Sequence, residues 1–267
     1  MERNPNQGIL HFNTGKTKFS ISRYPSSGEL GFWIQHYWLI AWDLRGQEPY
    51  TQEVLQHPGV NIVFEQGNSR ISGIDRRKSV NLLQEEGQIV GVLFRPGAFY
   101  SFFKTPAATL NDHTAPLSDY FPIDCRTFEE ELFSLEDHGK RIEMVERLLV
   151  QWMPDRDETI VILNDVINGI VKDREITQVE HVVERFGMTK RTLQRLFRQY
   201  IGVSPKWMIQ RYRMHEAGEL IEQGLDLAHL AMDLGYTDQA HFSKDFKAAV
   251  GKSPREYAKN NRTLLRE

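Results

Sequence analysis

The sequence predicts an α+β chain of more than one domain, with a β-rich N-terminal part and an all-α C-terminal third. Two observations lead to this division. Residues 9 to about 120 contain short apolar runs, partly alternating, that glycine and proline separate. From about residue 125 the apolar residues recur with helical spacing, and in the last third a helical unit returns after about 49 residues.

The N-terminal strands are expected in four places. Residues 34–42 form an aromatic, partly alternating run, and residues 60–65 form an apolar run that ends at Gly67. Further runs follow at 69–74 and 89–94 with similar spacing. Short strands at such intervals are typical of a β-sandwich or a β-barrel.

A helical connector is expected next. Helices at 127–153 carry one apolar stripe, formed by Ile142, Val145, Leu148, Leu149 and Trp152, and a second stripe covers residues 160–171. This pattern predicts a β-rich sensor or dimerisation domain over 1–125, a connector over 126–173 and a helical domain over 174–267.

The first copy of the repeat predicts two helices joined by a tight turn. Gly187 is expected to end the first helix, and Thr189 is expected to cap the second. On the second helix Leu193, Leu196 and Phe197 are expected to face inward. The outward residues form a polar ridge at helical spacing: Lys190, Arg191, Gln194, Arg195 and Arg198.

The second copy repeats this plan. Leu193 and Phe197 return as Phe242 and Phe246, and Gly235 with Thr237 supplies the second turn and its expected cap. The outward residues of its second helix include Gln239, His241, Ser243 and Lys244. Ser204-Pro205 opens a long helix between the copies, as a serine cap followed by proline does.

A polar helix of this kind is narrow enough for the major groove of DNA, where arginine reads guanine and glutamine reads adenine. A polar helical face is more often merely solvated, and a helical repeat can also bind another protein without DNA. Because both copies place a cap and a polar ridge at matching positions, the repeat favours two DNA-reading units.

The last third also resembles the AraC/XylS family of bacterial transcription regulators. The resemblance rests on residues 235–247 (GYTDQAHFSKDFK) and 251–257 (GKSPREY), within about residues 174–262. It implies two helix-turn-helix units in successive major-groove segments. The base-facing candidates are then Arg191, Gln194, Arg195, Gln239, His241, Ser243 and Lys244. Val183 departs from the family, which often has alanine there.

The N-terminal part resembles a domain found before such units in some bacterial regulators, through residues 57–65 and 91–99. The family then implies a cupin-like sensor barrel. Aromatic and cationic residues of these strands are candidates for a small-molecule site, or they simply fill the barrel: Trp38, Trp42, Phe64, Arg95 and Tyr100.

Chemistry of other kinds has no support in the sequence. No His-x-His pair precedes a glutamate, and neither a Gly-x-Ser-x-Gly elbow nor a phosphate-binding loop occurs. We therefore expect no enzyme, no metal and no cofactor. The expected partners are double-stranded DNA, a candidate small-molecule effector, RNA polymerase and a second copy of the chain.

Charge and location agree with this interpretation. The net charge of −3 divides into +3 over residues 160–267 and −6 over the remainder. No run of 18 apolar residues occurs, residues 1–6 lack the apolar stretch of a secretory signal, and Cys125 is the single cysteine. The sequence therefore predicts a cytoplasmic protein without a membrane segment.

Overall fold

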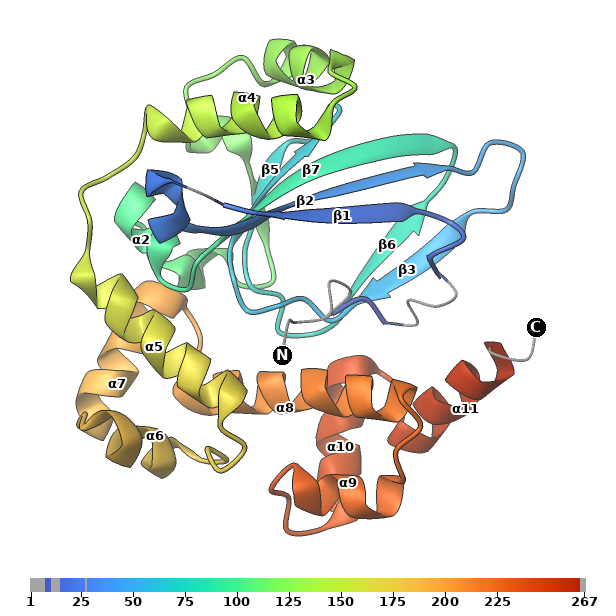
Figure 1. Cartoon of the computed structure of the whole chain (residues 1–267), viewed down its shortest axis with the longest axis vertical. Coiled ribbons are helices and arrows are strands. Elements are labelled where there is room, and N and C mark those ends of the chain that lie inside the picture. Colours follow the sequence, from blue (N-terminus) through green and yellow to red (C-terminus); the bar gives the residue numbers. More distant parts are fainter. Residues whose placement is uncertain (1–7, 11–14, 27, 265–267) are drawn as a thin grey trace.

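The structure is a computed structural model that describes residues 8–10, 15–26 and 28–264. The expectation for residues 1–6 falls outside these residues. In Figure 1 the β-rich N-terminal part lies above a row of C-terminal helices. No helix in the described residues is long and apolar enough to cross a membrane.

Most strands form one antiparallel sheet, in the order β1-β2-β7-β4-β5-β8. These strands are β1 (Ser20–Pro25), β2 (Ile34–Asp43), β4 (Asn61–Glu65), β5 (Arg70–Ser72), β7 (Glu86–Phe94) and β8 (Thr114–Pro116). A separate antiparallel pair contains β3 (Tyr50–Val54) and β6 (Ser79–Leu83). No ladder joins the two sheets among the described residues, so the expected barrel is not closed.

The two faces of the large sheet have different surroundings, because successive side chains of a strand point to opposite sides. One face is mainly apolar and includes Tyr37, Phe64 and Val92. It packs against the helices α2 (Ala98–Phe103), α3 (Cys125–Ser134) and α4 (His138–Val150). The opposite face, which carries Trp38 and Asn61, borders a cavity beneath β3 and β6.

The strands expected over 34–42, 60–65 and 89–94 are present as β2, β4 and β7, and 69–74 is shortened to β5. The sequence analysis missed β1, β3, β6 and β8. In β6, polar and apolar residues alternate over Ser79–Leu82, but Val80 and Leu82 are 59% and 60% exposed, so its apolar side faces no core.

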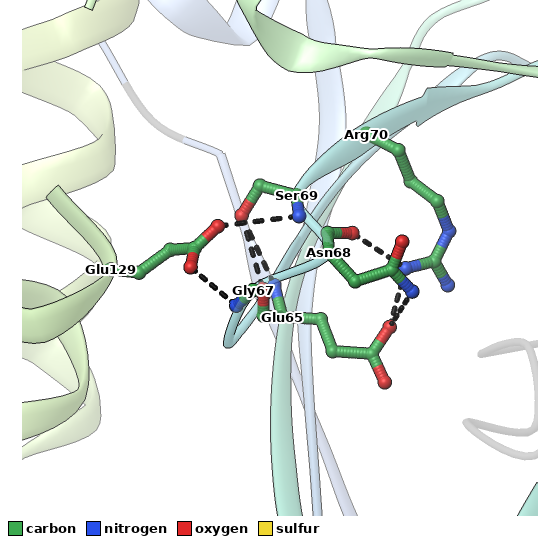
Figure 2. A network of polar contacts seen from close by, with 6 residues as sticks. All are labelled: Glu65, Gly67, Asn68, Ser69, Arg70 and Glu129. Atoms are coloured by element: carbon green, nitrogen blue, oxygen red, sulfur yellow. Dashed lines mark hydrogen bonds and ion pairs between the residues drawn. The ribbon is translucent and has the colours of Figure 1, made fainter. Parts of the chain in front are cut away.

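The connector belongs structurally to the N-terminal core. Ile142, Val145, Leu148 and Leu149 of α4 are all buried there, whereas Trp152 is 41% exposed. Figure 2 shows how α3 also holds the turn between β4 and β5: the buried Glu129 carboxylate accepts hydrogen bonds from the Gly67 and Ser69 amides, at 2.6 and 3.3 Å.

The next helix, α5 (Glu158–Lys172), links two cores. Ile160 packs in the N-terminal core, while Leu163, Val166, Ile167 and Ile170 pack with the helices that follow. Its start is fixed by Asp157, whose side chain caps the helix and also accepts hydrogen bonds from Ser101 and Tyr200.

The remaining helices form two clusters around the long α8 (Pro205–Glu222). The first cluster contains α6 (Val179–Phe186), α7 (Lys190–Leu196) and a π-helical turn (Phe197–Ile201). The second contains α9 (Leu227–Asp233), α10 (Gln239–Val250) and α11 (Pro254–Leu264). The all-α C-terminal third is therefore confirmed.

Candidate nucleic-acid interface

The first unit has the expected helix-turn-helix geometry. Gly187 ends α6 with a φ of 61°, a left-handed conformation that suits glycine. The Thr189 hydroxyl then caps α7 by accepting a hydrogen bond from the Thr192 amide at 3.1 Å. Leu193, Leu196 and Phe197 are buried, as their spacing predicted.

The polar ridge of α7 faces solvent. Arg191, Gln194, Arg195 and Arg198 are all exposed, and no ion pair holds these arginines among the described residues. Lys190 is exposed too, but its ammonium lies 2.6 Å from a Glu180 carboxylate oxygen. The ridge thus offers three guanidinium groups and one amide on a helix that its buried side holds in place.

The second unit follows the same plan with one difference. Gly235 makes the turn with a φ of 77°, but the cap of α10 is Asp238 and not Thr237 as the sequence suggested. The Asp238 carboxylate accepts a hydrogen bond from the His241 amide at 2.7 Å. Threonine and aspartate are both common capping residues, so two adjacent candidates are hard to tell apart from sequence.

The exposed side of α10 is mixed in charge. Gln239, His241 and Lys244 are exposed, whereas Ser243 is half-buried. His241 lies 3.6 Å from Asp245, which also accepts a hydrogen bond from the Tyr236 hydroxyl at 3.2 Å. Burial and the Asp245 charge raise the pKa of Tyr236, so this phenol stays protonated and can donate. The exposed side of α10 therefore carries less positive charge than the polar ridge of α7.

Helix α8 holds the two units together. It starts at Ser204, whose hydroxyl caps it, and Pro205, as the sequence predicted. Its Arg213 is buried and donates hydrogen bonds to the carbonyls of Asp173, Arg174 and Ile176 at 3.1, 3.0 and 2.9 Å. These bonds join α8 to the segment that precedes α6 in the first unit.

The turn of the second unit also meets the first unit directly. A Cβ added at Gly235 would lie 2.3 Å from the Thr177 side chain, so only glycine allows this close approach. The two recognition helices are consequently parts of one packed body. Both polar ridges were predicted from the sequence, but the role of Arg213 was not, because a charged residue in a helix is usually exposed to solvent.

Comparison with known proteins agrees with this geometry. A family model described as a helix-turn-helix domain matches residues 182–260. The transcriptional activator RhaS of Escherichia fergusonii is 35% identical over 83 residues, which cover 31% of this chain and 30% of RhaS. An uncharacterised helix-turn-helix regulator of Haemophilus influenzae is 32% identical over 83 residues, covering 31% of this chain and 28% of that protein. Residues 182–260 therefore form a helix-turn-helix domain of the AraC/XylS type.

The relationship to these AraC/XylS relatives is confined to one part of the chain, which spans about 30% of their length. Residues 22–116 match a different model, a domain of unknown function (DUF6597). The C-terminal domain of AraT, a response regulator from Geobacillus stearothermophilus, is 29% identical and covers 37% of this chain and 84% of that structure, with a TM-score of 0.35.

The N-terminal part is docked on α8. The Arg211 guanidinium is buried, donates to the Asp75 carbonyl at 2.7 Å and lies 4.6 Å from the centre of the Trp207 ring. Burial lowers the pKa of Arg211 to about 10, which leaves it charged at neutral pH. One helical turn further on, the His215 ring stacks on His57 at 4.4 Å.

Further contacts reach both helical units. The Asn111 amide donates to the Gly202 carbonyl at 2.7 Å, close to the first unit. Leu10 and Leu55 are part of the core of the second unit, and Lys252 lies 3.7 Å from Glu53. The N-terminal part therefore contacts both helical units as well as α8.

The five candidate ligand residues do not form one site. Trp38 and Trp42 line the cavity of about 430 Å³ beside the large sheet, whereas Phe64 is buried in the core on its opposite face. Arg95 donates to the Gly31 carbonyl at 2.6 Å. Tyr100 packs against Tyr200 of the first unit with ring centres 4.7 Å apart. The structure thus brings only the two tryptophans together.

Proposed function

We propose that this protein is a sequence-specific DNA-binding transcription regulator. The observation that carries the proposal is the pair of helix-turn-helix units, each with an exposed polar helix, fixed to the same long helix. The residues that we assign to DNA contact are those expected from the sequence: Lys190, Arg191, Gln194, Arg195, Arg198, Gln239, His241, Ser243 and Lys244. Of these, Arg191, Gln194 and Arg195 are the strongest candidates for base edges, given their spacing on α7.

The chain divides, in this proposal, into residues 1–125 for sensing or self-association, 126–173 as a connector, and 174–267 for DNA binding. A cupin-like relationship of the first part belongs to the proposal as well, although its sheets are open. Since the target is chromosomal DNA, we place the protein in the cytoplasm. A small-molecule effector and RNA polymerase are the further partners that belong to this proposal.

Self-association through residues 1–160 is a further part of the proposal. The apolar stripe that suggested it, from Ile142 to Leu149, is buried inside the chain. A dimer would therefore use another surface of residues 1–160. Two copies on paired sites would raise the apparent affinity through avidity.

Footprinting tests the proposal. Two rigidly joined units should protect an asymmetric site of roughly 15–20 bp per monomer, covering two adjacent major-groove segments. The probe is the promoter region beside the gene for this protein, with a shuffled sequence of the same length as control. Equal binding to both sequences would show DNA binding without sequence preference, and no binding at all would point instead to a helical module that binds protein.

A further inference from the structure

Asp245 on α10 is a carboxylate that side chains from three elements contact. The Tyr236 hydroxyl, in the turn before α10, donates to its Oδ2 atom at 3.2 Å. The Gln210 amide, on α8, donates to the same oxygen at 3.4 Å. The Nε2 atom of His241, one helical turn earlier on α10, lies 3.6 Å from it as well. Asp245 therefore joins the recognition helix of the second unit to its turn and to α8.

The charge of Asp245 lacks a cationic partner as long as His241 is neutral. Its side chain is only 26% exposed, and burial of a charge is unfavourable unless opposite charge or hydrogen bonds compensate for it. Gln210 is a neutral donor, and so is Tyr236, since burial and the Asp245 charge raise the pKa of this phenol. Arg213 of α8 acts on Tyr236 through its charge, but its ion pair is with another residue. In the described part of the chain, His241 is thus the only basic side chain paired with Asp245.

The surroundings of His241 hold the imidazole on one side and leave it open on the other. The Tyr236 ring packs edge-on against it, with ring centres 5.3 Å apart. The Asp238 cap accepts a hydrogen bond from the His241 backbone amide at 2.7 Å, and Lys244 follows on the exposed side of α10. The His241 side chain is 54% exposed. With Nε2 directed at Asp245, the second ring nitrogen, Nδ1, is available to a partner outside the chain.

The protonation state of an imidazole decides which base edge it can bind. An imidazole changes its charge between about pH 5 and pH 8. In the protonated ring both nitrogens donate, and guanine offers two neighbouring acceptors, N7 and O6, in the major groove. In a neutral ring whose Nε2–H group faces Asp245, Nδ1 is an acceptor, for which guanine has no donor in that groove. Adenine differs, because its N7 acceptor lies beside the N6 donor.

We propose that Asp245 is a positioning residue for His241, and that the second unit reads a guanine through the protonated imidazole. The preference for guanine at one position of the second half-site then increases as the pH falls. The first unit does not respond in this way, because the arginines of its α7 ridge keep their charge. The inference rests on the proposed function, since it concerns how the second unit reads DNA.

The DNA test uses the full chain and the site that footprinting defines. Every base pair of this site is replaced in turn, and affinities are measured by fluorescence anisotropy at about pH 6 and pH 8 and at constant ionic strength. At one position we expect the ratio of the affinities for guanine and adenine to be about threefold to tenfold larger at the lower pH. In His241→Gln this ratio should be the same at both pH values. A site at which no base preference changes with pH would overturn the proposal.

The variant Asp245→Asn tests the positioning role. It keeps the shape of the side chain and an oxygen that can accept the Tyr236 hydroxyl, but it removes the charge that faces His241. We expect the pH response of the guanine preference to disappear, while the affinity at the higher pH changes by less than about twofold. Near-ultraviolet circular dichroism verifies that the variant is folded. An unchanged pH response in Asp245→Asn would show that His241 reads the base without Asp245 and would overturn the assignment.

The matched control is His229→Gln, which removes a different histidine of the same unit. His229 lies on α9, its side chain is 80% exposed, and it is 3.5 Å from the exposed Asp226. This variant should leave both the guanine preference and its pH response unchanged. Loss of the pH response in His229→Gln would assign the response to α9 and contradict the proposal.

A measurement without DNA separates this inference from the proposed function. Three-bond nuclear magnetic resonance couplings to the ring carbon Cγ of His241 report whether its side chain keeps one rotamer. We expect a single rotamer in the original full chain and an average over several rotamers in Asp245→Asn. Averaging already in the original chain would overturn the positioning role. A chain that shows the single rotamer but never binds DNA would instead contradict the proposed function and leave the contact of Asp245 with His241 standing.

Discussion

Arg195 is the residue whose substitution distinguishes base reading from simple charge attraction. It is exposed on α7 and has no ion-pair partner in the described part of the chain. If it contacts a base edge, Arg195→Ala should cost about 1–3 kcal/mol of binding free energy and relax the preference at one position. Fluorescence anisotropy with a set of single-base operator variants measures both effects.

The matched control for that experiment is Arg126→Ala, which removes an exposed arginine from α3 that forms an ion pair with Glu130. It lowers the net charge equally and should leave the preference unchanged. If Arg195→Ala weakens specific and random DNA by the same factor, Arg195 neutralises phosphate and does not read sequence.

His36 should make stability depend on pH. Its pKa is about 4 in the folded chain against an ordinary 6.5, because burial and then Arg23 disfavour the imidazolium. The folded state is therefore favoured fully above pH 6.5, and this contribution is lost as the pH falls toward 4. Across that window it amounts to about 3 kcal/mol. Urea unfolding at pH 7 and pH 5 should show a smaller difference in His36→Gln than in the original chain; equal differences would contradict the assignment.

At the level of elements, Gly91 in β7 should be intolerant of any side chain. The Cβ of Gly91→Ala would overlap the Trp38 ring, which Asn61 holds in place, so we expect a loss of about 1–3 kcal/mol of unfolding free energy. Gly218→Ala is the control, because a Cβ there meets nothing within 4 Å inside α8. That change should be neutral or stabilise by up to about 1 kcal/mol. Similar effects of the two changes in urea unfolding would argue against a fixed position of the Trp38 ring.

The elements that the sequence predicted correctly are those with a strong internal period. Strands β2, β4 and β7 and the helices from α4 to α8 each carry an apolar pattern that their own residues define. The missed strand β6 is short, and its apolar residues Val80 and Leu82 are exposed; it is held by pairing with β3 and borders a cavity. Both polar ridges were found because helical spacing alone places them.

What the sequence could not show is how distant segments meet. Arg211 bonds to Asp75 across 136 positions, and His215 contacts Gln56 across 159. In the sequence, Arg211 and His215 fit the pattern of solvent-exposed residues on a connecting helix. The aromatic candidates were likewise grouped by type, whereas the alternation of the sheet separates Trp38 from Phe64 onto opposite faces.

At the scale of the whole molecule, α5 determines where a stable DNA-binding fragment can begin, because its apolar residues belong to the core of the first unit. The sequence alone placed the start of the helical domain at residue 174. Four apolar residues of α5 are, however, buried in the core of the first unit: Leu163, Val166, Ile167 and Ile170. Burial of each side chain contributes about 1.5–3 kcal/mol to the stability of that core.

We therefore expect a fragment of residues 155–267 to unfold cooperatively and bind the same site as the full chain. Residues 174–267 should lose the order of α6 and α7 and retain at most the contacts of α10. Thermal unfolding followed by circular dichroism, with footprinting of both fragments, tests this. Equal stability and equal footprints would show that α5 belongs to the connector alone.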